Sequence, residues 1–96
     1  MPRVLYTVQA ERDLQEIVEH IALANLTAAV EWLDHMEALF GLLASQPSLG
    51  ERMETRRFGE VRRHGTGNYA IYYRLADSDL QILRVLHAAR DQEPLL

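Results

Sequence analysis

The 96-residue sequence predicts an α+β fold in which a helical hairpin packs on one face of an antiparallel sheet, with the element order β-α-α-β-β-β. Apolar residues recur at helical spacing in the first half of the chain, whereas apolar and polar residues alternate after Gly50, as is typical of strands. A chain of this length builds one hydrophobic core, and no repeat or linker divides it. We therefore expect a single domain over residues 1–96.

The first half of the sequence predicts one short strand and two helices. Residues 3–8 alternate as a strand does, and the hydroxyl of Thr7 can cap the helix that follows. Residues 25–27 form a short break, in which Thr27 can cap a second helix. Because the link is so short, the two helices should pack as an antiparallel hairpin. The apolar stripes are Leu14, Ile17, Ile21 and Ala24 in the first helix and Ala29, Trp32, Leu33, Met36, Phe40 and Leu43 in the second.

The second half of the sequence predicts three strands. Pro47 ends the second helix because proline cannot continue the hydrogen-bond ladder, and Gly50 suits the turn that follows. We expect strands at about residues 58–64, 69–75 and 80–87, of which the last two are apolar on both faces and should be central or covered. The expected core consists of Leu14, Ile17, Ile21, Trp32, Met36, Phe40, Ile71, Tyr73 and either Ile82 or Leu83.

The charge is distributed unevenly along the chain. The net charge is -4, and every cationic side chain is an arginine. Residues 1–51 carry two arginines and eight acids, whereas residues 52–96 carry eight arginines and six acids. Domains that bind nucleic acid strongly are usually basic overall, because phosphate neutralisation drives their affinity. This acidic chain should therefore engage an anion only locally, and the lack of lysine fits a compositional bias as well as it fits a function.

Metals, cofactors and membranes are not expected. The chain has no cysteine, so disulfides and thiolate metal sites are excluded. His20 and His35 fall among acids on the predicted helices, which indicates solvated side chains, and no metal-binding motif such as HExxH is present. The start MPRVLYTV lacks the apolar stretch of a signal peptide, and no segment is long enough to span a membrane, so we expect a cytoplasmic protein.

One group of side chains could support cleavage of a phosphodiester. Such a reaction needs a base, an acid and cations for the developing charge, and His87, Tyr72, Arg74 and Arg84 could supply them. The alternative is structural, because a histidine at a strand end usually hydrogen-bonds to nearby backbone. Alternation places Tyr69, Ile71 and Tyr73 on a core face, and it places Tyr72 beside Arg74 on the other, as the better surface candidate.

Four segments of the chain resemble the ParE branch of the ParE/RelE superfamily, which comprises small toxins of bacterial type II toxin–antitoxin modules. Thr7, Ala10, Asp13, Leu14 and Ile17 carry the resemblance in the first helix. It continues through PSLG at residues 47–50, YAIYYR at residues 69–74 and ILRVLHAARD at residues 82–91. The resemblance covers nearly the whole chain in the same order, and it implies the same β-α-α-β-β-β fold.

The superfamily includes two kinds of toxin. RelE-like members are described as ribosome-dependent mRNA endoribonucleases, and ParE-like members as poisons of DNA gyrase without nuclease chemistry. The tail after Asp91 contains no tyrosine, histidine or lysine, and the lysines typical of RelE sheets are missing. The resemblance therefore implies a gyrase inhibitor with no catalytic residue. The alternatives are a RelE-like endoribonuclease and a decayed, non-toxic module that only binds antitoxin.

The resemblance also implies a partner, a co-encoded ParD-like antitoxin, and contact with DNA only through the antitoxin complex. Such antitoxins order an acidic tail on the toxin, which a positive sheet surface would bind. The alternative is that the arginines pair internally with Glu54, Glu60, Asp77 and Asp79. The candidate partner-binding residues are Arg57, Arg62, Arg63, Tyr72, Arg74, Arg84, His87 and Arg90.

Overall fold

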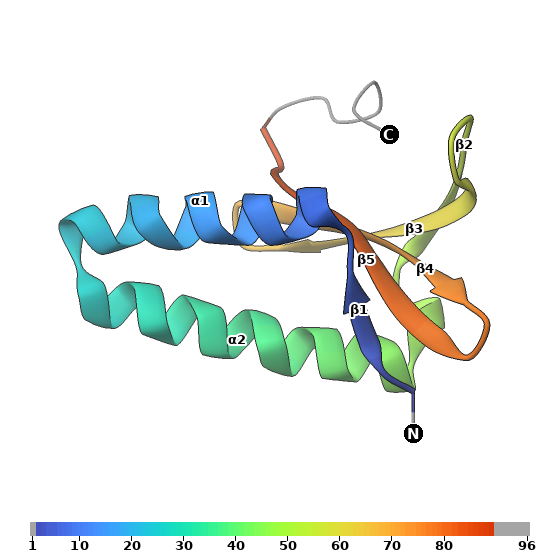
Figure 1. Cartoon of the computed structure of the whole chain (residues 1–96), viewed down its shortest axis with the longest axis horizontal. Helices are drawn as coiled ribbons and strands as arrows, with labels where there is room; N and C mark the ends of the chain where they lie inside the picture. Colours follow the sequence, from blue (N-terminus) through green and yellow to red (C-terminus); the bar gives the residue numbers. More distant parts are fainter. Residues whose placement is uncertain (1, 90–96) are drawn as a thin grey trace.

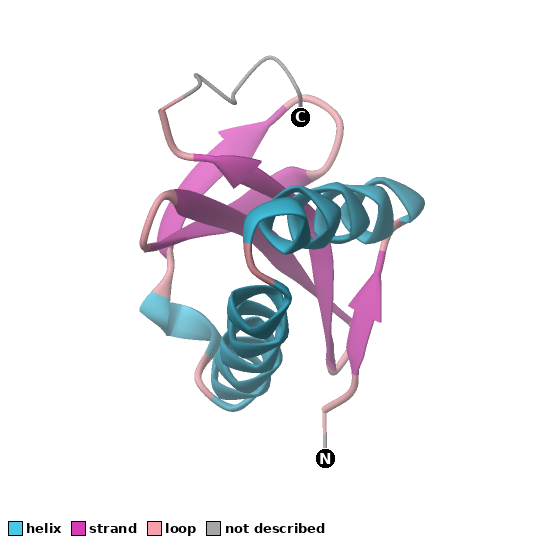
Figure 2. Ribbon diagram, turned by 90° about the vertical axis from the view of Figure 1, so that its left-hand side faces the viewer, coloured by secondary structure: helices cyan, strands magenta, loops and turns pink. Residues whose placement is uncertain are grey.

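The computed structural model describes residues 2–89 and consists of a helical layer and a sheet layer (Figure 1). The helices run antiparallel as a hairpin that covers one face of the sheet, and the far end of this hairpin projects beyond the strands (Figures 1 and 2). The fold class expected from the sequence is confirmed. The elements are β1 (Val4–Tyr6), α1 (Val8–Ala24), α2 (Leu26–Ser45), the 3-10 turn η1 (Pro47–Leu49), β2 (Glu51–Thr55), β3 (Gly59–Thr66), β4 (Tyr69–Ala76) and β5 (Asp79–His87).

The sheet differs from the expectation in two details. Its order is β1-β5-β4-β3-β2, and β1 pairs parallel to β5, so the sheet is mixed rather than purely antiparallel. Alternating side chains reveal that a strand exists but not which neighbour it pairs with or in which direction. The strand β2 was also missed, because its sequence ERMET is short and polar, as befits an edge strand.

Side-chain caps fix where the two helices begin. The hydroxyl of Thr7 accepts a hydrogen bond of 3.0 Å from the backbone N–H of Ala10, as the sequence predicts. Asn25, rather than Thr27, caps α2: its side-chain oxygen accepts from Ala28 N at 3.0 Å, while its own N–H donates to Ile21 O. One residue therefore ends α1 and starts α2, which makes the link so short that the helices must lie antiparallel.

Within residues 2–89, neither helix has both the length and the apolar character needed to cross a membrane.

The apolar residues form two clusters, one on each face of the sheet. The helices pack on one face of the sheet, and we call the opposite face of the sheet the outer face. The cluster beneath the helices includes Ala10, Met36, Phe40, Leu43, Ile71, Tyr73, Leu80, Ile82 and Val85, with Leu14, Ile17 and Trp32 packed against it in partly buried positions. The cluster on the outer face contains Val61, Ala70, Tyr72 and Leu83, with Met53, Phe58 and Leu86 packed against it.

The choice between Ile82 and Leu83 as the core residue is resolved by an irregularity in β5. The register of β4 and β5 shifts between Tyr72, which pairs with Arg84, and Tyr73, which pairs with Ile82. Leu83 is therefore an extra residue in its strand, and the alternation reverses at this point. Both side chains are buried, Ile82 beneath the helices and Leu83 on the outer face.

Candidate partner-binding surface

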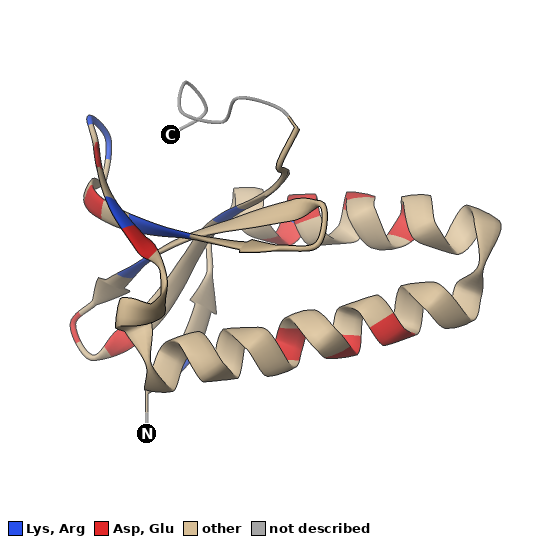
Figure 3. Ribbon diagram, turned by 180° about the vertical axis from the view of Figure 1, so that it is seen from behind, with Lys and Arg blue, Asp and Glu red and all other residues tan. Residues whose placement is uncertain are grey.

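Three arginines lie on the outer face of the sheet or at its rim. Arg63 and Arg74 point outward from β3 and β4, and Arg57 belongs to the turn between β2 and β3. The guanidinium carbons of Arg57 and Arg74 both lie 5.1 Å from the ring centroid of Phe58, which packs on the outer cluster. The aromatic ring thus gathers two cations from different elements, while acids lie along both helices (Figure 3).

Tyr72 does not occupy the surface position that the sequence suggested. It is 4% exposed and belongs to the outer cluster, and its hydroxyl accepts a hydrogen bond of 3.3 Å from Arg63 Nε. The prediction was wrong because neighbouring apolar side chains cover this face as well. Tyr72 therefore positions Arg63, and its ring has no exposed face on which a base could stack.

Most arginines of the second half have no carboxylate partner among residues 2–89. Within residues 2–89, the ion pairs join Arg3 to Asp79, Arg52 to Glu60 and Arg84 to Asp13. The hydrogen bond from Arg3 holds the pKa of Asp79 below its ordinary value. The arginines without a carboxylate partner in the described part are Arg56, Arg57, Arg62, Arg63 and Arg74. Internal neutralisation by neighbouring acids, the alternative considered from the sequence, therefore accounts for few of these charges.

Arg84 forms an ion pair inside the molecule. Its Nε and Nη2 donate to the two carboxylate oxygens of Asp13 at 2.7 and 2.9 Å, and the backbone N–H of Val85 donates to the same carboxylate at 3.0 Å. The hydrogen bond to Asp13 raises the pKa of Arg84 above its ordinary value. Only 18% of the Arg84 side chain is exposed, so little of it remains for a partner. This pair fastens α1 to the edge of β5 beyond the end of β1.

The role of Asp13 was missed, although the sequence contained a signal for it. Asp13 lies three residues after Ala10 and four before Ile17, which places it on the buried stripe of the helix rather than on the wet side. An acid on an apolar stripe requires a buried cation or backbone donor. Such a pattern therefore predicts an ion pair, here with a residue 71 positions away.

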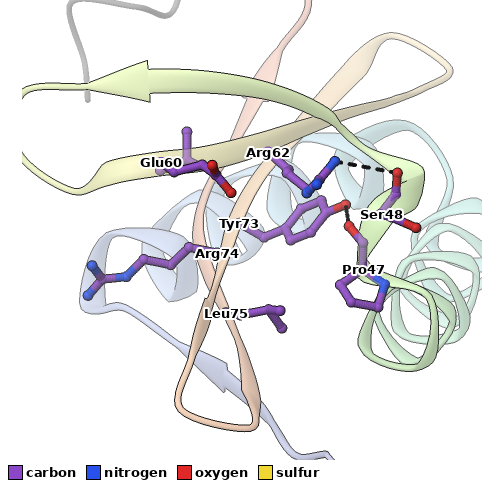
Figure 4. A pocket seen from close by; sticks show the side chains of 8 residues that line it. Pro47, Ser48, Glu60, Arg62, Tyr73, Arg74 and Leu75 are labelled. Atoms are coloured by element: carbon purple, nitrogen blue, oxygen red, sulfur yellow. Dashed lines mark hydrogen bonds between the residues drawn. The ribbon is translucent and has the colours of Figure 1, made fainter.

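Arg62 lies on the side of the sheet that faces the helices. Its Nη1 donates to Gly50 O at 2.7 Å, with a longer contact of 3.5 Å to Ser48 O. The hydroxyl of Tyr73 donates to Pro47 O at 2.6 Å (Figure 4). The same hydroxyl accepts a hydrogen bond of 2.8 Å from Gly50 N. Burial raises the pKa of Tyr73, so the phenol stays neutral and keeps its proton for Pro47. Together these bonds clamp η1 onto the sheet.

His87 lies at the exposed end of β5 and faces the helix side of the sheet. It pairs in register with Tyr69, and the two rings meet edge to face at 5.5 Å. Its Nδ1 accepts a hydrogen bond of 3.2 Å from the backbone N–H of Ala89. This is the local backbone contact that a histidine at a strand end usually makes.

The structure does not assemble the four residues considered for phosphodiester cleavage. His87 faces the helix side, whereas Tyr72 and Arg74 belong to the outer face and Arg84 is bound to Asp13. Arg90, which the sequence proposed for partner binding, lies outside the described residues. A base, an acid and a cation therefore do not converge on one point in residues 2–89.

The remaining histidines form no metal site within residues 2–89, where no cluster of three or more His, Asp or Glu side chains is arranged to hold an ion. His35 is exposed, as expected, but its Nε2 also lies 2.9 Å from the hydroxyl of Thr66. This contact links α2 to the end of β3, close to the edge-to-face pair of Trp32 and Tyr69. It therefore adds to the packing of the helices on the sheet.

Comparisons with known proteins agree with this architecture. The model of a family described as the ParE toxin of the type II toxin–antitoxin system parDE matches residues 4–92. A solved chain of the chromosomal ParDE system from P. aeruginosa superposes with a TM-score of 0.70 at 21% identity, covering 91% of this chain and 96% of that one. A chain of the RelBE2 toxin–antitoxin complex from Mycobacterium tuberculosis gives a TM-score of 0.60 at 31% identity, covering 91% and 99%. Proteins with curated descriptions gave no match.

The match over nearly the whole chain identifies the family. The chain belongs to the ParE toxins of type II toxin–antitoxin systems, within the ParE/RelE superfamily. The sequence resemblance is thereby confirmed at the level of the toxin class.

Proposed function

We propose that this toxin inhibits DNA gyrase and is neutralised by a co-encoded ParD-like antitoxin, an acidic segment of which binds the outer face of the sheet. The observation that carries the partner assignment is the set of arginines that have no carboxylate partner within residues 2–89, among them Arg57, Arg63 and Arg74, in a protein of net charge -4. An anionic segment would gain several charge-assisted hydrogen bonds there without displacing internal ion pairs. Both similar structures come from toxin–antitoxin systems, which supports a partner of this kind.

The choice of gyrase over ribosome-bound message rests on the residues available for chemistry. Arginine is protonated throughout the physiological range and stabilises charge well, but it is a poor base. His87 is the one histidine among the four candidates, and histidine is the usual general base near neutral pH, but it lies on the other side of the sheet from Tyr72 and Arg74. A protein that acts by binding gyrase needs no such assembly, which favours the ParE-like function.

The target is tested by inducing the toxin in cells without antitoxin. Plasmid supercoiling, DNA breaks and the integrity of translated mRNA are followed together. We expect growth to stop, plasmid supercoiling to be lost and DNA breaks to appear, while the mRNA stays intact. We expect the His87→Ala variant to behave identically. His87 is exposed, so this substitution opens no buried cavity, although it removes the edge-to-face contact with Tyr69.

Two outcomes contradict the proposal. Rapid cleavage of mRNA at defined positions within codons, abolished by His87→Ala, would identify the protein as a RelE-like endoribonuclease. Normal growth, despite a folded protein that still binds antitoxin, would assign a non-toxic binding module.

A further inference from the structure

A groove of about 410 Å³ opens between η1 and the strands β3 and β4 (Figure 4). It exists because α2 ends at Ser45, before Pro47, so the helical layer stops short of the last residues of β4. Leu75 lines this groove and is 54% exposed, although its cross-strand partner Leu80 is completely buried. Val61 and Arg74, which belong to the outer face, also line this groove, whereas Arg57 and Arg63 do not.

The wall of the groove is held rigidly. The hydroxyl of Tyr73 joins the carbonyl of Pro47 to the N–H of Gly50, and Arg62 binds the carbonyl of Gly50. These bonds fix η1 in one position relative to the strands. A site that is already formed does not have to be ordered when a ligand binds, so binding costs little conformational entropy.

The lining combines an apolar strip with a cationic end. Pro47 and Leu75 supply aliphatic surface. Arg62 uses only its Nη1 within residues 2–89, so its remaining N–H groups have no partner in this part of the chain. Glu60 also lines the groove, but its carboxylate accepts a hydrogen bond of 2.6 Å from Arg52. Arg74 lines the groove as well, so the charge available to a ligand is positive.

We propose that this groove binds an extended acidic peptide segment, which places one aliphatic side chain against Pro47 and Leu75 and a carboxylate against Arg62. A nucleobase fits poorly, because Tyr73 is completely buried and its ring offers no surface for stacking. A polyphosphate fits poorly too, because the strip is apolar and Glu60 stands in the lining. The assignment rests on Pro47, Leu75 and Arg62, and it does not depend on the toxic target or on Arg57 and Arg63 of the outer face.

The proposal is tested with a short peptide probe and backbone amide NMR of the ¹⁵N-labelled protein. The probe is acetyl-Asp-Leu-Glu-amide, and the two control peptides replace both acids by lysine or the leucine by serine. At about 1 mM probe, we expect chemical-shift changes centred on the amides of Ser48, Gly50 and Leu75. We expect neither control peptide to produce them.

Two protein variants separate the groove from a general loss of structure. Leu75→Asp introduces an anion at an exposed position, and we expect it to weaken probe binding by about tenfold or more. Leu26→Asp makes the same change at a leucine on α2 that is also exposed, and it should leave binding unchanged. Absence of shifts at the groove, equal binding of the lysine peptide, or shifts centred on Arg57 and Arg63 instead would each overturn the proposal.

Discussion

The Gly50→Ala variant is expected to lose about 3 kcal/mol of unfolding free energy. Gly50 is buried, and a Cβ atom at this position would collide with the hydroxyl of Tyr73 and lie 2.9 Å from two ring carbons. The Tyr73 ring is fully buried and cannot move aside without opening the core. The expected result is a lower midpoint in urea denaturation with an unchanged slope.

A second substitution identifies the cause of that loss. Tyr73→Phe removes the hydroxyl, and it should cost about 1–3 kcal/mol because Gly50 N and Pro47 O lose their partner. The same change also removes the atom that a Cβ at Gly50 would meet first. The double variant should therefore be more stable than the sum of the two single losses predicts. Strict additivity would show that the two residues do not interact, and Gly41→Ala, where a Cβ meets nothing within 4 Å, is the matched control.

The Asp13→Ala variant is expected to cost about 3 kcal/mol. The substitution leaves Arg84 without its counter-ion in a largely buried position, and it leaves the N–H of Val85 without an acceptor. An uncompensated buried charge is more costly than the pair itself is stabilising. Thermal or urea unfolding followed by circular dichroism measures the effect.

The controls for this prediction lie on the same helix and on the partner strand. Glu16→Ala removes an acid from an exposed position of α1 and should change stability by about 0.5 kcal/mol or less. The double change of Asp13 and Arg84 to alanine should recover part of the loss, since it removes both charges. An Asp13→Ala protein as stable as the Glu16→Ala protein would show that the ion pair does not hold α1 to β5.

Periodicity predicted most of the fold because each element buries a regular stripe. Met36 and Phe40 at helical spacing, and Ile71 and Tyr73 at strand spacing, lie in the core as expected. The parallel pairing of β1 was not predictable in this way, since it depends on where the chain returns after the hairpin. The extra residue Leu83 was not predictable either, because one inserted position reverses every later side chain in its strand.

The candidate site was predicted in composition but not in arrangement. The sequence indicated that arginines gather on the sheet, and Arg57, Arg63 and Arg74 do lie on or beside its outer face. It did not reveal that Arg84 is bound by Asp13 or that Arg62 is bound by Gly50 O, because both partners are remote in the chain. Charge counts along a sequence show how many cations exist, whereas their availability depends on tertiary contacts.

The proposed binding of an acidic antitoxin segment to the outer face is tested most directly by calorimetric titration of the proposed antitoxin into two toxin variants with the same change in net charge. Arg57→Glu reverses an exposed charge beside the outer face, and Arg12→Glu reverses an exposed charge on α1. If the outer face binds the acidic antitoxin segment, Arg57→Glu should weaken the complex by about tenfold or more and make its affinity less sensitive to salt, with Arg12→Glu close to wild type. Equal affinities for the two variants would contradict the assignment of the outer face.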